Sequence, residues 1–267
     1  MSEELKAHLL AAHQAVFDGV LAAVDGLDEA GWATPTGCPG WDVHDQLAHI
    51  VGVERAMLGD PPDVVELPDD LPHVKNVFGQ QVEVAVAARR GRPPAELVAE
   101  ARETFERRVR SLAAMEASTL GEPMDGPGGM RFKASQMLRT RLFDMTCHEQ
   151  DVRRAVGRPG DLDGPHADIA VEQVIRAWAR NLPERLGPVG VLGIEVAGRP
   201  RATIDLRDGT LRRGEDGPEP DAVLGLDAGQ LLAIGTGRSD APGIDELSVS
   251  GDRGLVERLL ADASVTP

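Results

Sequence analysis

Two residues of one predicted helix, Asp144 and His148, carry side chains suited to binding a metal ion. They are four residues apart, so on an α-helix their side chains lie on one face, one turn apart. A carboxylate and an imidazole at this spacing can chelate one divalent metal. Ordinary ion pairs on helices have the same spacing, so the pair alone leaves both interpretations open.

A third candidate ligand, His49, stands within the apolar segment Leu47-Ala48-His49-Ile50-Val51. A polar ring in such a segment needs a buried partner, which could be a metal or simply another core group. If His49 meets Asp144 and His148, three protein ligands would leave a position open for water or substrate. That pattern is typical of catalytic zinc, although iron, nickel and manganese accept the same ligands.

The elements that must position these residues are predicted to be helices. Apolar residues at helical spacing from Leu5 to Leu27 predict the first helix, which the polar stretch 31–40 ends. Asp42 is a good N-cap for a second helix that runs to about Gly59. Further helices are predicted at 73–90, 94–117, 132–156 and 165–182, with loops at 60–72 and 121–129.

The hydrophobic pattern changes after Gly187, where short apolar runs alternate with turn residues. These runs predict strands, and Asp208-Gly209 is a hairpin signal. A strand near 222–226, a helix at 228–235, a strand at 246–250 and a helix at 252–262 follow. The predicted fold class is therefore α plus α+β, with a helical domain at 1–160, a connecting helix at 161–186 and a small α+β domain at 187–267.

Composition limits the functions that this chain of 267 residues could have. Its net charge of −16 argues against binding nucleic acid or an anionic membrane surface. The first residues lack the basic and apolar regions of a signal peptide. We therefore expect a cytoplasmic protein, monomeric or homodimeric, that acts on small molecules and keeps Cys38 and Cys147 reduced.

Two motifs resemble a known family. The segment Pro39-Gly40-Trp41-Asp42-Val43-His44-Asp45-Gln46-Leu47-Ala48-His49 resembles a signature of the mycothiol-dependent maleylpyruvate isomerase family, which belongs to the DinB-like helical bundles. The segment from Asp144 to His148, followed by Asp151-Val152 and Gly157-Arg158-Pro159, is similar to that family's second motif. Near the C-terminus, Gly225-Leu226-Asp227 and Gly235-Thr236-Gly237-Arg238 resemble its small domain, which is related to sterol-carrier folds.

The resemblance implies a fold and a chemistry. The fold would be a DinB-like four-helix bundle followed by a small, sterol-carrier-like α+β domain. His49, Asp144 and His148 would bind a divalent metal, zinc before other metals, although the family commonly has Glu at the position of Asp144. Mycothiol, the low-molecular-weight thiol of actinobacteria, would be the cosubstrate for isomerisation or S-transfer on a small electrophile.

Arg238 is the candidate catalytic residue outside the metal site. In the resembled isomerases an arginine of the C-terminal domain serves catalysis, and a guanidinium can bind a carboxylate through two hydrogen bonds. A surface arginine in a turn is the alternative. Two other functions also stay open: a thiol-independent metal hydrolase of the same fold, and a non-catalytic protein that binds a small molecule.

The neighbours of the candidate ligands have weaker claims. We expect His44 at the exposed start of its helix, and Cys147 as a small core residue. Cys38 precedes the first motif and could line the site entrance. Trp41 is expected to pack the start of its helix into the bundle or to wall the pocket. Asp151 could orient a ligand or face solvent.

Overall fold

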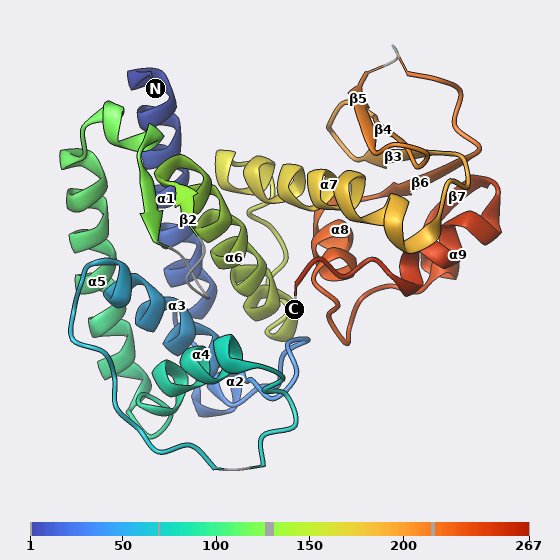
Figure 1. Cartoon of the computed structure of the whole chain (residues 1–267). Coiled ribbons are helices and arrows are strands. Elements are labelled where there is room, and N and C mark those ends of the chain that lie inside the picture. The colour runs from blue at the N-terminus through green and yellow to red at the C-terminus, as the bar shows by residue number, and fades with distance from the viewer. Residues whose placement is uncertain (1, 69, 126–130, 215–216, 267) are drawn as a thin grey trace. The chain divides into compact units, whose positions relative to one another are not determined.

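The computed structural model describes residues 2–68, 70–125, 131–214 and 217–266, and the chain divides into two compact units, Met1–Ile169 and Ala170–Pro267 (Figure 1). Helices build the first unit, and a five-stranded sheet with helices builds the second. The predicted fold class is thus confirmed. The division between the units falls inside one helix, α7 (Pro165–Leu186).

The first unit is a bundle built around four long helices. It contains α1 (Glu3–Val24), α2 (Glu29–Trp32), α3 (Val43–Met57), α4 (Val77–Ala87), α5 (Pro94–Ala114), the 3-10 helix η1 (Ala117–Gly121), the short strands β1 (Pro123–Asp125) and β2 (Arg131–Lys133), and α6 (Ala134–Ala155). Helix α1 packs against α5 and α6, and α3 packs against α4, α5 and α6. Helices α3 and α6, which carry the candidate ligands, are therefore neighbours.

Local sequence signals set the ends of these two helices. The Asp42 side chain accepts a hydrogen bond from the backbone N–H of Asp45, 2.9 Å away, so Asp42 is the predicted N-cap of α3. Helix α6 ends before Gly157, whose φ of +65° lies in the left-handed region that glycine adopts at low cost. The predicted ends at Asp42 and Gly157 are confirmed.

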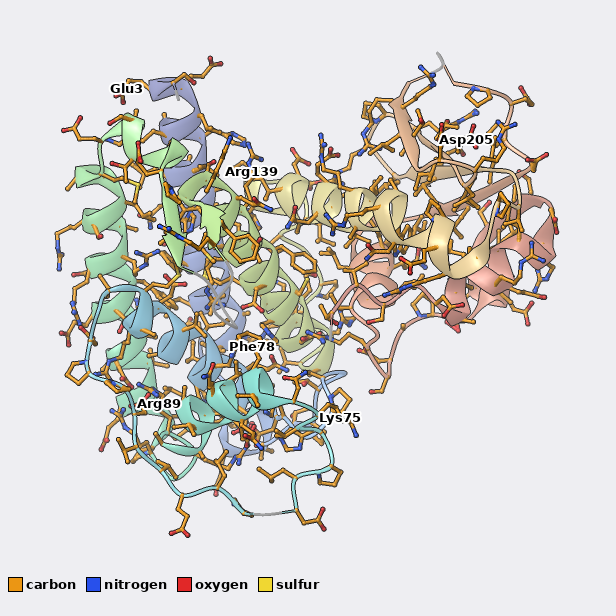
Figure 2. All side chains as sticks on the ribbon, viewed as in Figure 1. Glu3, Lys75, Phe78, Arg89, Arg139 and Asp205 are labelled. Carbon is orange, nitrogen blue, oxygen red and sulfur yellow. The ribbon has the colours of Figure 1, made fainter. Side chains whose placement is uncertain are left out.

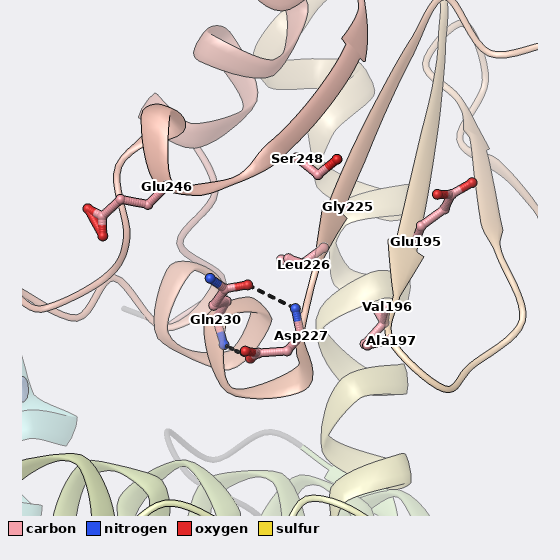
Figure 3. Close-up of a pocket in the computed structure, with 9 residues that line it drawn as sticks. All are labelled: Glu195, Val196, Ala197, Gly225, Leu226, Asp227, Gln230, Glu246 and Ser248. Carbon is pink, nitrogen blue, oxygen red and sulfur yellow. Dashed lines mark hydrogen bonds between the residues drawn. The ribbon is translucent and has the colours of Figure 1, made fainter. Parts of the chain in front are cut away.

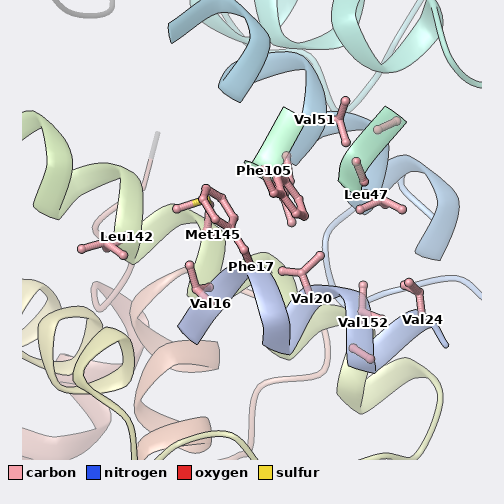
Figure 4. Packing of buried hydrophobic residues seen from close by; sticks show 14 of the residues in the cluster. Val16, Phe17, Val20, Val24, Leu47, Val51, Phe105, Leu142, Met145 and Val152 are labelled. Atoms are coloured by element: carbon pink, nitrogen blue, oxygen red, sulfur yellow. The ribbon is translucent and has the colours of Figure 1, made fainter. Parts of the chain in front are cut away.

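The core of the first unit is aliphatic with one aromatic stack. Phe17 of α1 and Phe105 of α5 stack with ring centroids 4.3 Å apart, among valines and leucines of α1, α3 and α6 (Figure 4). Helix α1 is also long and apolar enough to cross a membrane, but half of that stretch is buried inside the unit. Burying such side chains contributes about 1.5–3 kcal/mol each. The apolar residues of α1 are therefore those of a core helix.

Two segments depart from the predicted elements. The predicted loop at 121–129 contains β1, which pairs antiparallel with β2, while residues 126–130 lie outside the described part of the chain. Helix α4 begins later than predicted because the Asn76 side chain caps it, accepting from the N–H of Gly79. The described residues of 60–72 form a loop, as predicted, and Asp63 in it accepts a hydrogen bond at 2.7 Å from Arg89, a buried side chain that is labelled in Figure 2.

The second unit contains β3 (Val191–Val196), β4 (Ala202–Asp205), β5 (Thr210–Arg213), β6 (Ala222–Leu226), α8 (Ala228–Gly235), the 3-10 helix η3 (Ile244–Glu246), β7 (Ser248–Gly251) and α9 (Arg253–Ala261). The sheet order is β5-β4-β3-β6-β7, and only the β3–β6 pair among these strands is parallel. The predicted hairpin at Asp208-Gly209 is confirmed: it joins β4 to β5, and Gly209 has a φ of +76°.

Candidate metal centre

The structure brings His49, Asp144 and His148 together in the first unit, although His49 is distant from the other two in sequence. His49 Nε2 lies 3.1 Å from Asp144 Oδ2, and His148 Nε2 lies 3.5 Å from Asp144 Oδ1. One potential ligand atom from each residue lies within 4.8 Å of the other two. We call these three residues the open cluster, because the Asp144 side chain is 35% exposed whereas both imidazoles are buried.

The protonation states of His49 and Asp144 suit a metal ion. Burial lowers the pKa of His49 to about 4, so its imidazole is neutral at pH 7. Burial alone would raise the pKa of Asp144, but Arg141 and then the two histidines lower it well below its ordinary value. Neutral imidazoles and ionised carboxylates are the forms that bind metals.

Hydrogen bonds outside the open cluster fix the orientation of the His148 ring. Thr36 Oγ1 donates to the carbonyl oxygen of Trp41 and accepts from Gln46 Nε2 at 2.7 Å. The Gln46 amide oxygen is therefore directed to His148 Nδ1, 2.6 Å away, which must donate the proton. In the neutral form of the ring, His148 Nε2, which faces Asp144, then carries the lone pair that a metal would bind.

Trp41 lies against both histidines. Its ring centroid is 5.0 Å from that of His49 and 5.6 Å from that of His148. Trp41 Nε1 donates to Glu83 of α4 at 2.9 Å, and Glu83 is in turn held by His73 and Arg90. Trp41 therefore packs the start of α3 into the bundle and also walls the cluster, as the sequence allowed.

A chain of ion pairs leads from Asp144 into the bundle through two buried arginines and a glutamate. Arg141 contacts Asp144 Oδ2 through Nη1 and donates from Nε to Glu54 at 2.6 Å. Glu54, which is fully buried, also accepts from Arg108 of α5 at 2.6 Å. Burial would raise the pKa of Glu54, but Arg141 and Arg108 lower it, so this carboxylate is ionised. Our sequence reasoning missed Arg141, Glu54, Arg108 and Gln46.

A second set of donors shares His148. Ligand atoms of Cys38, His148 and Asp151 also lie within 4.8 Å of one another. Asp151 is buried, 3.3 Å from His148 Nδ1, and paired with Arg154. Asp151 therefore lies against a candidate ligand instead of facing solvent. Cys38 is half-buried beside the same histidine, consistent with the expected entrance position.

Another cluster lies on a different face of α6. We call Glu149, Asp161 and His166 the closed cluster, because Glu149 and His166 have no exposed side-chain surface. His166 Nε2 lies 3.8 Å from Glu149 Oε2 and 3.6 Å from Asp161 Oδ1. Arg153 donates to Glu149 at 2.6 Å. A Cβ on Gly19 would lie 2.1 Å from Asp161 Oδ2 and 2.7 Å from Glu149 Oε1, so a larger residue here would have to displace these carboxyl groups.

The remaining predicted residues lie elsewhere. Arg238 belongs to the second unit, just after α8, and its Nη1 donates to the carbonyl of Thr236 at 3.3 Å. Cys147 is buried as predicted. The prediction for His44 is wrong: it is only 8% exposed, because its Nε2 donates to the carbonyl of Arg92 at 3.0 Å and its ring meets Trp32 edge to face.

A separate hollow of about 440 Å³ lies in the second unit, beside β6 and the start of α8 (Figure 3). Asp227 and Gln230, which line it, form a capping box at the N-terminus of α8. Arg238 is not among the lining residues. The capping box accounts for these two polar side chains as parts of the helix start.

The fold and the open cluster together define a class: helical-bundle proteins with two histidines and a carboxylate converging from two neighbouring helices. The sequence model of the mycothiol maleylpyruvate isomerase N-terminal domain matches residues 13–153. This match spans more than half of the chain, and the chain belongs to that family.

Comparisons with other proteins agree with this fold. Two crystal structures of mycothiol-dependent maleylpyruvate isomerase, one of them a histidine-to-alanine mutant, are similar to this chain. The mutant has a TM-score of 0.59 and the other structure 0.56. Each is 14% identical to this chain, and each match covers 92% of both chains. A search of curated protein sequences finds no match.

Proposed function

We propose that this protein is a metal-dependent enzyme that activates mycothiol for isomerisation or S-transfer on a small electrophile. One observation carries the proposal: His49, Asp144 and His148 converge in a partly exposed cluster, in which His49 is neutral and Asp144 is ionised. Membership of the family supports mycothiol as the thiol, and the isomerases of similar fold support isomerisation as the reaction class.

The donor set fits a divalent ion, and zinc is the metal we propose. Two imidazole nitrogens and one carboxylate oxygen are ligands that zinc accepts, with a further position left for substrate. A divalent metal held there would lower the pKa of a bound thiol. Two neighbouring residues prepare the histidines for metal binding. Gln46 keeps the proton on His148 Nδ1, and Trp41 excludes water from one side of both imidazole rings.

A negatively charged electrophile needs a positively charged group on the protein to bind it. We propose Arg238 for binding a substrate carboxylate or the polar groups of the thiol, because guanidinium binds oxyanions through paired hydrogen bonds. The resemblance of Gly235-Thr236-Gly237-Arg238 to the family's C-terminal motif supports this role. Cytoplasmic localisation stays a prediction.

Metal analysis followed by thiol titration tests the proposal. Purified wild-type protein should hold one equivalent of zinc, bind mycothiol in its presence and convert maleylpyruvate only when mycothiol is added. His49→Ala and His148→Ala should each lose the zinc, whereas His166→Asn, which changes a histidine of the closed cluster, should retain it. A wild-type protein without zinc or thiol affinity would falsify the proposal.

A further inference from the structure

Asp144 has a short side chain and considerable exposure for a metal ligand, yet it is held firmly by one neighbour. Arg141 is one turn earlier on α6 and contacts Asp144 Oδ2. The Arg141 side chain is only 5% exposed. It makes the contact from within the bundle, so Asp144 is held on the side that faces the protein and not the side that faces solvent.

Arg141 is itself fixed by acceptors from α3. Its Nε donates to Glu54 Oε1 at 2.6 Å, and its Nη2 donates to the carbonyl of Ile50 at 3.2 Å. Ile50 directly follows His49, so one guanidinium joins the backbone beside one candidate ligand to the carboxylate of another. A planar guanidinium can make these three contacts at once, and a lysine ammonium of different shape cannot reproduce them.

Glu54 connects this arrangement to a third helix. It is fully buried, and its second oxygen accepts from Arg108 of α5 at 2.6 Å. Two arginines and two carboxylates therefore form a chain with balanced charge that runs from α5 through α3 and α6 to Asp144. Breaking such a buried chain at one member leaves a buried charge without its partner.

Resting on the proposed function, we propose that Arg141 is the positioning residue that makes Asp144 a metal ligand. Arg141 holds Oδ2 and leaves Oδ1, which lies 3.5 Å from His148 Nε2, for the ion. The aspartate then acts through one oxygen. The anchored guanidinium supplies the placement that the aspartate's short side chain does not provide by itself.

Zinc affinity, measured by competition with a chromogenic chelator, tests this role without reference to activity. Arg141→Met keeps much of the side-chain length and should weaken zinc binding by about 10–100-fold, the usual effect of removing a partner of a metal ligand. Arg141→Lys keeps the charge and should show an intermediate loss. Arg153→Met is the matched control: Arg153 also lies on α6 and pairs with a buried glutamate, but in the closed cluster.

A double-mutant cycle separates positioning from a general structural effect. If Arg141 acts through Asp144, then Arg141→Met should weaken zinc binding no further in an Asp144→Ala background. Equal losses in both backgrounds, or wild-type affinity in both Arg141 variants, would overturn the role of Arg141 alone. A wild-type protein that binds no zinc would overturn the proposed function as well. Should Arg141→Met fail to fold, Arg141→Lys in the same two backgrounds decides the question.

Discussion

Consecutive residues of α6, His148 and Glu149, belong to two clusters that contain the same kinds of side chain. The open cluster has two histidines and an aspartate, and the closed cluster has one histidine, a glutamate and an aspartate. In both, the potential ligand atoms lie within 4.8 Å of one another. Proximity of suitable donors therefore does not distinguish a metal centre from a structural network.

The difference lies in how each cluster balances its charge. Burial and the neighbouring Asp161 raise the pKa of Glu149 to about 9, so this carboxyl group is protonated at pH 7, and Arg153 adds a positive charge beside it. In the open cluster the Asp144 carboxylate is ionised, and Nδ1 of His148 donates a hydrogen bond to Gln46. The closed cluster balances its charge with a protonated glutamate and a guanidinium, whereas the open cluster combines an ionised carboxylate with the neutral imidazole of His49.

Replacing Glu149 or Asp144 by alanine should give the largest difference between an effect on stability and an effect on zinc binding. Glu149→Ala removes the shortest contact of Arg153 and opens a cavity at a fully buried position, so we expect a loss of about 3 kcal/mol in the free energy of unfolding. Asp144→Ala should cost only about 1 kcal/mol, because Asp144 is the partly exposed end of the chain of charges and Arg141 keeps its acceptors Glu54 and Ile50. This variant should, however, bind zinc too weakly to retain one equivalent through purification. Denaturant unfolding of the metal-free proteins and metal analysis measure the two effects.

The isosteric variant Glu149→Gln is the control for this comparison. An amide resembles the protonated carboxyl group, so Glu149→Gln should stay within about 1 kcal/mol of the wild type at pH 7. It should also keep its zinc. A loss of zinc in Glu149→Gln would mean that the closed cluster, and not the open one, holds the metal.

The hydrogen bond that orients His148 should have a smaller effect, confined to the open cluster. Gln46→Leu removes the nearer acceptor of His148 Nδ1 and leaves only the longer contact with Asp151, so we expect zinc affinity to fall about 10–100-fold. Gln150→Leu removes another buried amide, one that donates to the carbonyl of Gly160 at 3.0 Å near the closed cluster. Its zinc affinity should equal that of the wild type. Equal losses in both variants would show a general effect of deleting buried amides.

Part of this arrangement could be predicted from the sequence, because helices repeat a pattern. The four-residue spacing of Asp144 and His148 places both on one face, and the N-cap Asp42 and Gly157 mark helix ends that the structure confirms. The approach of His49 to Asp144 could not be derived from spacing. It depends on how α3 packs on α6, and only the family resemblance indicated it.

The buried charges had a signal that could have been found. Arg141 shares the inner face of α6 with Leu138, Leu142 and Met145, and Glu54 lies at the core-facing spacing from Leu47. A charged residue at a core position requires a buried partner of opposite sign.

Two other features gave no such signal in the sequence. Gln46 is uncharged, and its amide reaches across to another helix. Short strands such as β1 are hard to predict between Pro and Gly residues.

The smallest expected effect is a pH dependence that belongs to the closed cluster. Burial lowers the pKa of His166, and it outweighs the opposite effect of Asp161. The groups that face it are Glu149, Arg153, Asp161 and Asp168. The folded protein therefore keeps this imidazole neutral at a pH where the unfolded chain, with a pKa near 6.5, binds a proton. Stability should fall as the pH drops below about 6.5.

His166→Asn removes this proton-binding difference. Below about pH 6.5 the unfolding free energy of the variant should fall less steeply than that of the wild type, by at most about 1.4 kcal/mol per pH unit. Urea unfolding at several pH values, with and without zinc, measures the difference. Because His166 lies outside the open cluster, the difference between the two proteins should be the same with zinc present. A difference that disappears when zinc is added would place His166 among the metal ligands and remove the distinction between the clusters.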